Sequence, residues 1–423
     1  MKKYKIRIAD KVLQKKLSAK GAVLIEGTKW CGKTTTASQI AKSILSMQNP
    51  EEKEQNIRLA EISPSRLLNG KTPRLIDEWQ LAPKLWDAVR FEVDKRDEFN
   101  QFILTGSAVP ADLKDISHTG TGRISRMLMH PMSLFESQES NGSVSLSELF
   151  SGNTDIDGEN SISIDELAFL ICRGGWPKAV DLKQDIALTQ AIDYYDSVVN
   201  SDISRVDNIE RNPQRAKRLL QAYARSVGTQ TKLISLSNDV LNEDNNLGTN
   251  PTIYNYINAL QKIFVLEDSH AWNPNLRSKT AIRTTDTRYF TDPSIAAAAL
   301  GLGPNDLIDD IKTMGFFFEN LCIRDLRVYA DSLDGEIYHY RDKNGLECDA
   351  VIHLRNGAYG LIEIKLGGEK AIEDGKYTLN KLADNIDYNL MKKPAFKMVI
   401  TGIGKYAYKD NDTFIVPIGC LKD

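Results

Sequence analysis

The sequence predicts an α/β protein whose amino-terminal third is a parallel β-sheet flanked by helices. Three observations support this fold class. A glycine-rich loop, residues 27–34, lies between a short apolar strand and an amphipathic helix. Segments with strand-like and helix-like patterns then alternate as far as residue 130. In the last third, residues 315–400, the predicted order is helix, three strands, helix and strand.

The length and composition are those of an ordinary globular chain with several domains. The 423 residues allow two to four domains of roughly 100–200 residues each. Apolar residues make up 41% and charged residues 26%, and the net charge is −3, so a basic surface for nucleic acid would have to be local. The five cysteines lack zinc-like spacing, and apolar runs stay short of the ~18 residues of a membrane span. We therefore expect a reduced, cytoplasmic protein that does not enter a membrane.

The glycine-rich loop matches the phosphate-binding pattern G-x-x-x-x-G-K-[ST] at every defined position. Residues 22–25 are predicted to form a buried strand before it, and residues 35–45 a helix after it. In this setting backbone N–H groups and a helix N-terminus point at bound phosphate. We expect Lys33 to reach the β- and γ-phosphates of ATP and the Thr34 hydroxyl to bind Mg²⁺. The other loop positions expected to contact the nucleotide are Gly27, Thr28, Lys29, Cys31, Gly32 and Thr35. The alternative is an ordinary glycine-rich turn.

Two later strands end in polar residues where a nucleotide site needs them. The strand over 74–78 ends in Asp77 and Glu78, and the next ends at Thr105, closely followed by Ser107. Asp77 is expected to hold Mg²⁺ through its water shell, and Glu78 to polarise the attacking water. Thr105 or Ser107 would sense the γ-phosphate or position water. Ligands of parallel sheets bind at the carboxyl ends of the strands, where these residues fall. Alternatively, the first strand merely ends in solvated acids.

An arginine is a further candidate in this part of the chain. Arg123 and Arg126 follow a polar, glycine-containing stretch, residues 111–121, which is predicted to be a mobile loop. An arginine placed there would stabilise charge on a transferring phosphoryl group, within its own chain or across the interface of a homo-oligomer. Arg123 is the stronger candidate of the two. The alternative is a solvated or salt-bridged surface arginine.

These motifs resemble prokaryotic AAA+-type P-loop ATPases that carry an uncharacterised carboxy-terminal domain. The resemblance covers nearly the whole chain, and it implies an AAA+-like ATPase core, a winged-helix-like segment and a restriction-endonuclease-like domain. The matching segments are the phosphate loop and residues 75–78, 104–107, 122–124, 174–177, 289–293 and 318–320.

We expect four parts along the chain. Residues 1–137 would be the P-loop ATPase core and residues 138–204 a linker and helical lid. Residues 205–290 would be the winged-helix-like segment and residues 291–423 the restriction-endonuclease-like domain. The first boundary rests on residues 140–163, which are rich in Ser, Asn, Gly, Asp and Glu.

The winged-helix-like segment has a local excess of basic residues. A basic helix is followed by a second helix over residues 252–260, whose exposed side would present Tyr254, Asn255 and Asn258. Such a module places its second helix in the major groove of duplex DNA, while basic flanks contact phosphates. The alternative is a module used for protein contacts or packing. The basic residues are Arg205, Arg211, Arg215, Lys217, Arg218, Arg225 and Lys232, with Arg277, Lys279, Arg283 and Arg288 on a predicted hairpin wing.

The αβββαβ order of the last third resembles the core of PD-(D/E)XK nucleases. Asp349 lies on the second predicted strand, and Glu363 and Lys365 lie on one face of the third. The resemblance implies that Asp349 and Glu363 bind Mg²⁺, that Lys365 orients or activates water for phosphodiester attack, and that Glu319 is an outer acid. Two carboxylates in one pocket repel each other, so one pKa should rise when no cation is present. The alternatives are cross-strand ion pairs on a solvated face or an inert binding module.

Two functional hypotheses follow. In the first, the protein is an ATP-hydrolysing enzyme that acts on DNA and cleaves it with a metal ion. In the second, it is a nucleotide-switched regulatory or interaction protein whose carboxy-terminal domain only binds.

Overall fold

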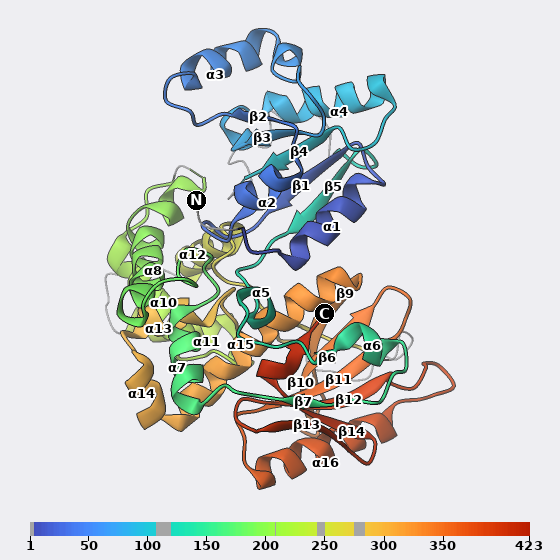
Figure 1. Ribbon diagram of the computed structural model, residues 1–423. Coiled ribbons are helices and arrows are strands. Elements are labelled where there is room, and N and C mark those ends of the chain that lie inside the picture. The colour runs from blue at the N-terminus through green and yellow to red at the C-terminus, as the bar shows by residue number, and fades with distance from the viewer. Residues whose placement is uncertain (1–3, 107–119, 208, 243–249, 275–283) are drawn as a thin grey trace. The chain divides into compact units, whose positions relative to one another are not determined.

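The computed structural model describes residues 4–106, 120–207, 209–242, 250–274 and 284–423. The chain forms two compact units (Figure 1). The first unit contains Met1–Pro131, Ser201–Arg211 and Asn258–Phe264, and the second contains Met132–Asn200, Asn212–Ile257 and Val265–Asp423. The four parts expected from the sequence therefore correspond to two compact bodies, and parts two and three are largely built into the second.

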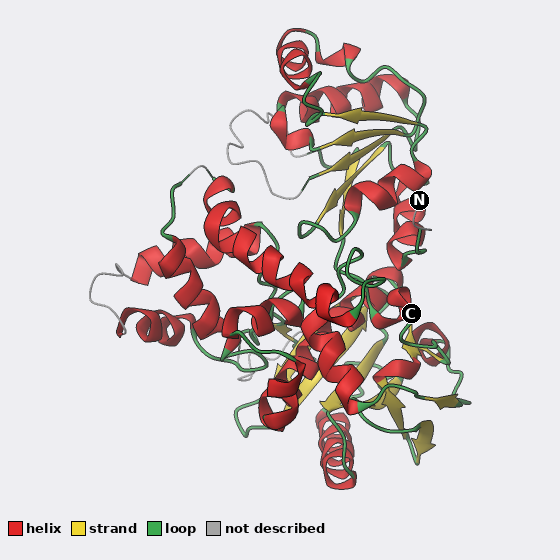
Figure 2. Cartoon of the chain, turned by 60° about the vertical axis from the view of Figure 1, so that its left-hand side comes forward, coloured by secondary structure: helices red, strands yellow, loops and turns green. Residues whose placement is uncertain are grey.

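The first unit is a five-stranded parallel sheet with helices on both faces (Figure 2). The three central strands are buried on both faces and largely apolar, as expected for a parallel sheet, and the two edge strands are partly exposed. The strand order is β2-β3-β4-β1-β5. The elements are α1 (Ile8–Leu17), β1 (Ala22–Glu26), α2 (Lys33–Ile40), β2 (Ser43–Ser46), α3 (Lys53–Ile62), β3 (Arg74–Asp77), α4 (Lys84–Arg96), β4 (Phe102–Thr105) and β5 (Ile124–Leu128).

The helix expected over residues 35–45 is shorter than the apolar pattern predicts. Helix α2 ends at Ile40, and Ile44 and Leu45, which were assigned to it, lie in strand β2. The prediction was wrong there because β2 pairs with β3, Ile44 opposite Leu75. A short apolar run fits either element, and the pairing with the sheet decides.

The second unit is built on an eight-stranded mixed sheet of order β7-β13-β14-β12-β11-β10-β9-β8. The long helix α15 packs against β9 and β10, and α16 packs against β11 and β12. The predicted order of helix, three strands, helix and strand is present from α15 to β12. The bounds are α15 (Ile311–Ser332), β9 (Gly335–Arg341), β10 (Glu347–Leu354), β11 (Tyr359–Lys365), α16 (Glu369–Asn385), β12 (Phe396–Thr401), β13 (Tyr406–Asp410) and β14 (Thr413–Pro417), with β7 (Gly158–Glu159) and β8 (His270–Ala271) at the edges.

Two isolated antiparallel bridges, Leu266 with Phe290 and Ser269 with Thr287, lie within residues 264–290, where the hairpin wing was expected. The remaining elements are α5 (Leu134–Ser137), β6 (Val144–Ser145), α6 (Leu146–Phe150), α7 (Ile164–Arg173), α8 (Gln184–Ser197), α9 (Ile203–Arg205), α10 (Pro213–Ala224), α11 (Leu233–Asn242), α12 (Asn250–Lys262), α13 (Pro293–Leu300), α14 (Pro304–Asp309) and β15 (Leu421–Lys422).

Residues 140–163, expected to be a linker, are instead part of the second unit. Strand β6 pairs with β15, and β7 extends the large sheet through β13. The Ser140 hydroxyl also donates a hydrogen bond to the Leu421 carbonyl at 2.7 Å. The polar composition hid this role, because only a few apolar side chains, such as Leu146 and Leu149, are buried there.

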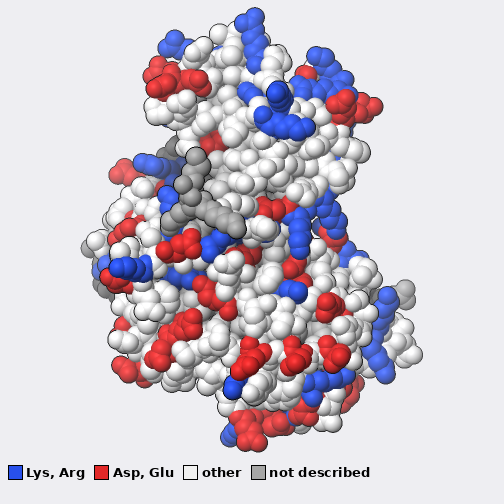
Figure 3. Space-filling model, in the orientation of Figure 1, with Lys and Arg blue, Asp and Glu red and all other residues white. Residues whose placement is uncertain are grey.

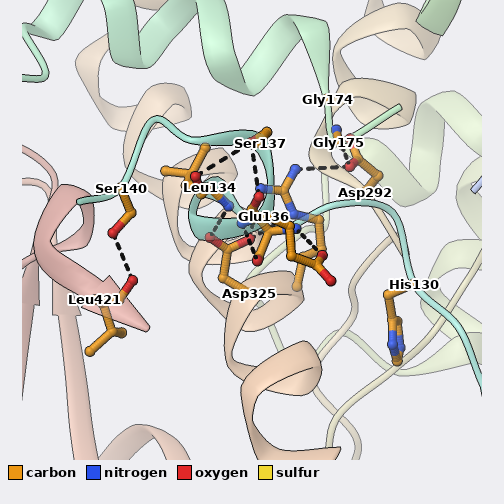
Figure 4. A network of polar contacts seen from close by, with 12 residues as sticks. His130, Leu134, Glu136, Ser137, Ser140, Gly174, Gly175, Asp292, Asp325 and Leu421 are labelled. Carbon is orange, nitrogen blue, oxygen red and sulfur yellow. Dashed lines mark hydrogen bonds and ion pairs between the residues drawn. The ribbon is translucent and has the colours of Figure 1, made fainter. Parts of the chain in front are cut away.

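A buried ion network joins distant segments of the second unit (Figure 4). The Arg324 guanidinium lies 3.0 Å from Asp292 and 2.7 Å from Asp325, and all three side chains are buried. Asp325 accepts a hydrogen bond from the Leu134 N–H at 2.9 Å, and Asp292 accepts one from the Gly175 N–H at 2.9 Å. Buried charges need such partners. This network gives residues 174–177 and 289–293 a structural role.

Candidate functional site

The phosphate loop of the first unit has the backbone shape that its sequence predicts. Gly27 has φ 140° and Gly32 has φ 103°, a region that favours glycine. A Cβ atom on Gly27 would lie 2.2 Å from the Met129 carbonyl oxygen. The buried Arg7 guanidinium, which sequence analysis missed, donates to the Cys31 carbonyl at 2.8 Å and so holds the loop from behind.

Lys33 points into the concave side of this loop. Its side chain is only 7% exposed, and its Nζ atom donates to the carbonyls of Gly27 at 2.9 Å and Thr28 at 2.8 Å. The ammonium group therefore lies where the pattern places phosphate, with loop carbonyls as its partners. Lys29 points elsewhere and pairs with Asp202 at 2.5 Å.

Asp77 is the centre of a polar cluster at the carboxyl ends of β1, β3 and β4. Its Oδ1 atom accepts hydrogen bonds from the hydroxyls of Thr34 at 2.7 Å and Thr105 at 2.8 Å. Its Oδ2 atom accepts one from the Gln48 amide at 3.3 Å. The Asp77 and Thr34 oxygens are the kind of ligand that Mg²⁺ prefers, so the residues fit this ion. Gln48 lies beyond the helix expected over residues 35–45 and was not among the predicted site residues.

Glu78 lies next to this cluster in an unusual backbone conformation. Its φ of 58° and ψ of 47° fall in the left-handed region, which costs a residue other than glycine some energy. Burial, and then the neighbouring charge of Asp77, raise the pKa of the Glu78 carboxyl above its usual value. The Gln80 amide donates to the carboxylate and keeps it in place. A raised pKa makes Glu78 a better proton acceptor near neutral pH.

Arg123 lies at the opposite end of the strands from the phosphate loop. Its carbonyl accepts a hydrogen bond from the Ala22 N–H, at the start of β1, whereas the phosphate loop follows the end of β1. The start and the end of β1 are four residues apart, which is about 13 Å at ~3.3 Å per residue. The Arg123 side chain is exposed and pairs with Asp94 at 2.7 Å. A role within its own chain is therefore ruled out by geometry, and only the role across an interface remains a proposal.

Three other residues were predicted for the nucleotide site, Arg126, Ser107 and Thr35. Arg126 pairs with Glu26 at 2.8 Å. Ser107 lies outside the described residues, so Thr105 is the polar strand end that the structure places beside Asp77. Thr35 follows Thr34 on helix α2 and is exposed.

The second unit brings Asp349, Glu363 and Lys365 together at one end of β10 and β11. The Lys365 Nζ atom lies 3.1 Å from Asp349 Oδ2 and 2.6 Å from Glu363 Oε2. Asp349 Oδ2 also accepts a hydrogen bond from the Ile364 N–H at 2.7 Å. The antiparallel register, Ala350 opposite Ile362, produces this convergence.

The charges of this cluster influence one another strongly. Burial, followed by repulsion from Asp349, raises the pKa of Glu363 well above its usual value. Burial alone would lower the pKa of Lys365, but the charges of Asp349 and Glu363 outweigh it and raise that pKa. The lysine therefore stays protonated, and Glu363 holds its proton more tightly than a free carboxyl group. A bound cation would favour the ionised form of Glu363.

A cavity of about 210 Å³ lies beside this cluster. Glu319 of α15 lines it, and Tyr289 donates a hydrogen bond to the Glu319 carboxylate. Burial and the charge of Asp349 raise the pKa of Glu319 well above its usual value. Further polar lining residues that sequence analysis did not predict include Gln230, His339, Arg341 and Glu347. Among the described residues no group of three His, Cys, Asp or Glu side chains could hold a metal ion. Two carboxylates nevertheless fit Mg²⁺, which commonly keeps several waters.

The basic residues expected to contact DNA divide into buried and exposed groups. Arg211 is buried and paired with Asp207 at 2.6 Å, and Arg288 is buried and paired with Asp268 at 2.5 Å. Neither can reach a phosphate, because each is already neutralised inside the protein. Arg277, Lys279 and Arg283 lie outside the described residues. The exposed basic residues are Arg205, Lys217, Arg225 and Lys232, and Asn255 and Asn258 are exposed on α12 as predicted.

The surface shows no single basic field on the face in Figure 3, where Lys and Arg are mixed with Asp and Glu. The five cysteines are all buried and free. In the part of the chain that the structure describes, no helix has both the length and the apolar character needed to cross a membrane.

The phosphate loop, the Thr34–Asp77–Thr105 cluster and the five-stranded parallel sheet define a P-loop ATPase domain of the AAA type. Residues 19–138 match the family described as AAA domain. Residues 164–306 match a domain of unknown function, DUF8612, and residues 314–421 match another, DUF4143. A search of curated proteins gave no match.

Three solved structures from archaea are similar to this chain. The Walker-type ATPase paby2304 of Pyrococcus abyssi is 14% identical, covers 70% of this chain and 96% of its own, and has a TM-score of 0.42. The STAND protein PH0952 from Pyrococcus horikoshii has a tetratricopeptide repeat sensor and is 10% identical to this chain. The match covers 79% of this chain and 48% of the other chain, with a TM-score of 0.22. The Hef helicase domain of Pyrococcus furiosus is 12% identical, and the match covers 94% of this chain and 89% of the other chain, with a TM-score of 0.20. The assignment therefore rests on the AAA domain match and the geometry of the loop.

Proposed function

We propose that this protein hydrolyses ATP and cleaves DNA phosphodiester bonds at the Asp349–Glu363–Lys365 site, with Mg²⁺ at both sites. The observation that carries the proposal is the convergence of two carboxylates and a lysine on one point beside a cavity that Glu319 also lines. Four residues from three elements meet there, and the element order matches that of the PD-(D/E)XK nucleases.

The nucleotide site supports ATP hydrolysis through residues with separate tasks. Lys33 would exchange its loop carbonyls for the β- and γ-phosphates, and Thr34 and Asp77 would hold Mg²⁺. When bound, that ion would neutralise charge on the phosphates. Glu78, with its raised pKa, would take a proton from the attacking water, and Thr105 would orient the Asp77 carboxylate. Arg123 would act only across the interface of a homo-oligomer.

Asp349 and Glu363 would hold Mg²⁺ in the second unit, where the ion would supply charge neutralisation and an activated water. The proposed partner is double-stranded DNA, contacted by the exposed basic residues Lys217, Arg225 and Lys232 of the second unit. We place the protein in the cytoplasm, where the five free cysteines would stay reduced.

One observation favours the alternative of an inert binding domain that is switched by the nucleotide. The Lys365 ammonium already lies between the two carboxylates and partly neutralises them. A domain that kept the nuclease fold only for binding would need no metal there. The two hypotheses therefore differ in whether a divalent ion displaces Lys365.

A cleavage assay separates the hypotheses. Full-length protein is incubated with linear and circular duplex DNA in the presence of Mg²⁺ or Mn²⁺, with and without ATP. The nuclease hypothesis predicts metal-dependent cleavage that Asp349→Asn abolishes. The matched control is Asp384→Asn, the same substitution at an exposed position of α16, which should cleave like the wild type. Cleavage that survives in Asp349→Asn would refute the assigned site. Absence of cleavage by the wild type as well as by Asp349→Asn would favour the hypothesis of an inert binding domain.

A further inference from the structure

The phosphate loop carries one large side chain that the proposed function has not used, the indole of Trp30. Trp30 is 43% exposed, whereas the other four tryptophans of the chain, Trp79, Trp86, Trp176 and Trp272, are at most 3% exposed. Burial of an aromatic side chain removes about 150–250 Å² from water and is a large part of the energy of a core. The exposed indole of Trp30 forgoes much of this gain.

Trp30 also has an unfavourable backbone conformation. Its φ of 66° falls in the left-handed region, where a bulky residue is an outlier and a glycine would fit without strain. Residues held in such conformations are concentrated at active sites and in segments that hold ligands. A tryptophan at this position is therefore unfavourable for two independent reasons, the exposed apolar surface and the backbone, and a ligand that contacts the indole would explain both.

The position of Trp30 in the loop limits which ligand it can reach. The neighbouring side chains are already engaged, since Thr28 and Cys31 are buried and Lys29 forms an ion pair. Trp30 precedes Lys33 by three residues, and a chain spans at most ~3.6 Å per residue, so their Cα atoms lie within about 11 Å of each other. The exposed indole is therefore close to the group that is expected to hold the phosphates.

The base is the part of a nucleotide whose chemistry matches an exposed indole. Lys33 and the backbone N–H groups of the loop bind phosphates, so the ribose and the base must extend out of the loop. Each base has two flat π-faces on which an aromatic side chain can stack. Tripolyphosphate, which is the phosphate chain of ATP without its nucleoside, has no such face. A contact between Trp30 and the base would thus distinguish ATP from tripolyphosphate.

We propose that the indole of Trp30 stacks on the base of the bound nucleotide. The inference rests on the ATP binding that is part of the proposed function, and it gives the phosphate loop a second task besides holding phosphates. Stacking recognises a flat ring rather than its hydrogen-bonding groups, so Trp30 contributes about equally to the binding of ATP and GTP. Its contribution is smaller for CTP, because a pyrimidine offers a smaller ring to the indole.

Two substitutions test the proposal by calorimetric titration of the full-length protein. Trp30→Leu keeps a large apolar side chain but has no ring, and Trp30→Phe keeps a ring; both place a residue other than glycine at the same φ. Trp30→Leu should bind ATP with MgCl₂ about 5- to 150-fold more weakly than the wild type, which is the ~1–3 kcal/mol of one base stack. Its affinity for tripolyphosphate with MgCl₂ should be unchanged, and Trp30→Phe should bind ATP more tightly than Trp30→Leu.

A second measurement needs only the wild-type protein and a background. Acrylamide in solution quenches the fluorescence of exposed tryptophans, and the other four tryptophans are buried. The quenching therefore reports mainly on Trp30, and Trp30→Phe supplies the background. ATP with MgCl₂ should protect the indole from acrylamide because the base covers it. Tripolyphosphate with MgCl₂ should give no protection, although it occupies the same loop.

The outcomes separate the stack from nucleotide binding itself. If Trp30→Leu keeps wild-type affinity for ATP, or loses affinity for ATP and tripolyphosphate alike, the stack is refuted while the phosphate loop keeps its function. If the wild type binds neither ligand, nucleotide binding fails and the stack fails with it. If Trp30→Leu does not fold, the acrylamide measurement decides, and equal protection by the two ligands refutes the stack. Protection by duplex DNA or by a higher protein concentration in place of ATP would assign the indole to DNA or to a second copy, and would also refute it.

Discussion

Replacing Lys33 by alanine should weaken ATP binding by about 10- to 150-fold. In the structure the Lys33 ammonium makes two hydrogen bonds to loop carbonyls, at 2.9 and 2.8 Å. On ATP binding these would be exchanged for bonds to phosphate oxygens, and a hydrogen bond to a charged group is worth about 1.5–3 kcal/mol. Each ~1.4 kcal/mol is tenfold in affinity, so losing one such bond produces the stated range.

The measurement is calorimetric titration of the full-length protein with ATP and MgCl₂. Fluorescence of Trp30 is a second reporter, because this tryptophan lies in the phosphate loop and is 43% exposed. Lys29→Ala is the matched control, since it removes the same charge from the same loop. Its side chain pairs with Asp202, so the affinity should stay within threefold of the wild type.

Two results would refute this reasoning. Wild-type affinity in Lys33→Ala would show that the lysine does not contact the nucleotide. An equal loss of ATP affinity in Lys29→Ala would show that the loop acts only through its total charge. The position of Lys33 within the loop would then not explain ATP binding.

The remaining predictions concern catalysis, assembly, pH and DNA. Glu78→Gln should keep ATP affinity in calorimetry and lose hydrolysis at least ~100-fold, because an amide cannot take the proton of water; normal turnover would contradict this. Arg123→Ala should lose hydrolysis but keep ATP affinity, and mixing it with Lys33→Ala should restore some turnover; no recovery at any ratio argues against action across an interface. The raised pKa of Glu363 means that the folded state binds the proton more tightly than the unfolded state, so without divalent ions this contribution to stability should decrease as pH rises above about 4.5 and through the folded pKa. Thermal unfolding in EDTA measures it, and Mg²⁺ should reduce the slope; an unchanged slope would contradict a cation site. Binding of duplex DNA through residues 205–290 should weaken with salt, with a log–log slope of about −0.9 per neutralised phosphate; binding that ignores salt would exclude phosphate contacts.

Contiguous residues account for what could be predicted about the nucleotide site. The conformation of the phosphate loop depends on Gly27 and Gly32, whose positive φ angles follow from local sterics. Asp77 and Thr105 were predicted from strand ends, and parallel strands bring their carboxyl ends to one edge. The proximity of Asp349 and Glu363 could be predicted for a similar reason, because β10 and β11 form an antiparallel hairpin with a short connection.

Side chains whose partners come from distant segments could not be predicted in the same way. Arg288 was expected on a DNA-binding wing, yet it is buried against Asp268. Arg123 was expected near the phosphates, yet the start of β5 lies beside the start of β1. Gln48 became a candidate only through the pairing of β2 with β3, which brings its amide within 3.3 Å of Asp77.

The physical reason for this division is the range of the interactions. Backbone conformation and strand or helix periodicity depend on neighbours within a few residues. Motifs such as the phosphate loop can therefore be recognised from the sequence. The partner of a charge, and the edge of a sheet on which it lies, are chosen by the packing of segments far apart in the chain. Lys365 shows both: its place on β11 follows from the two-residue period of a strand, but its ion pairs with Asp349 and Glu363 exist only after the sheet has formed.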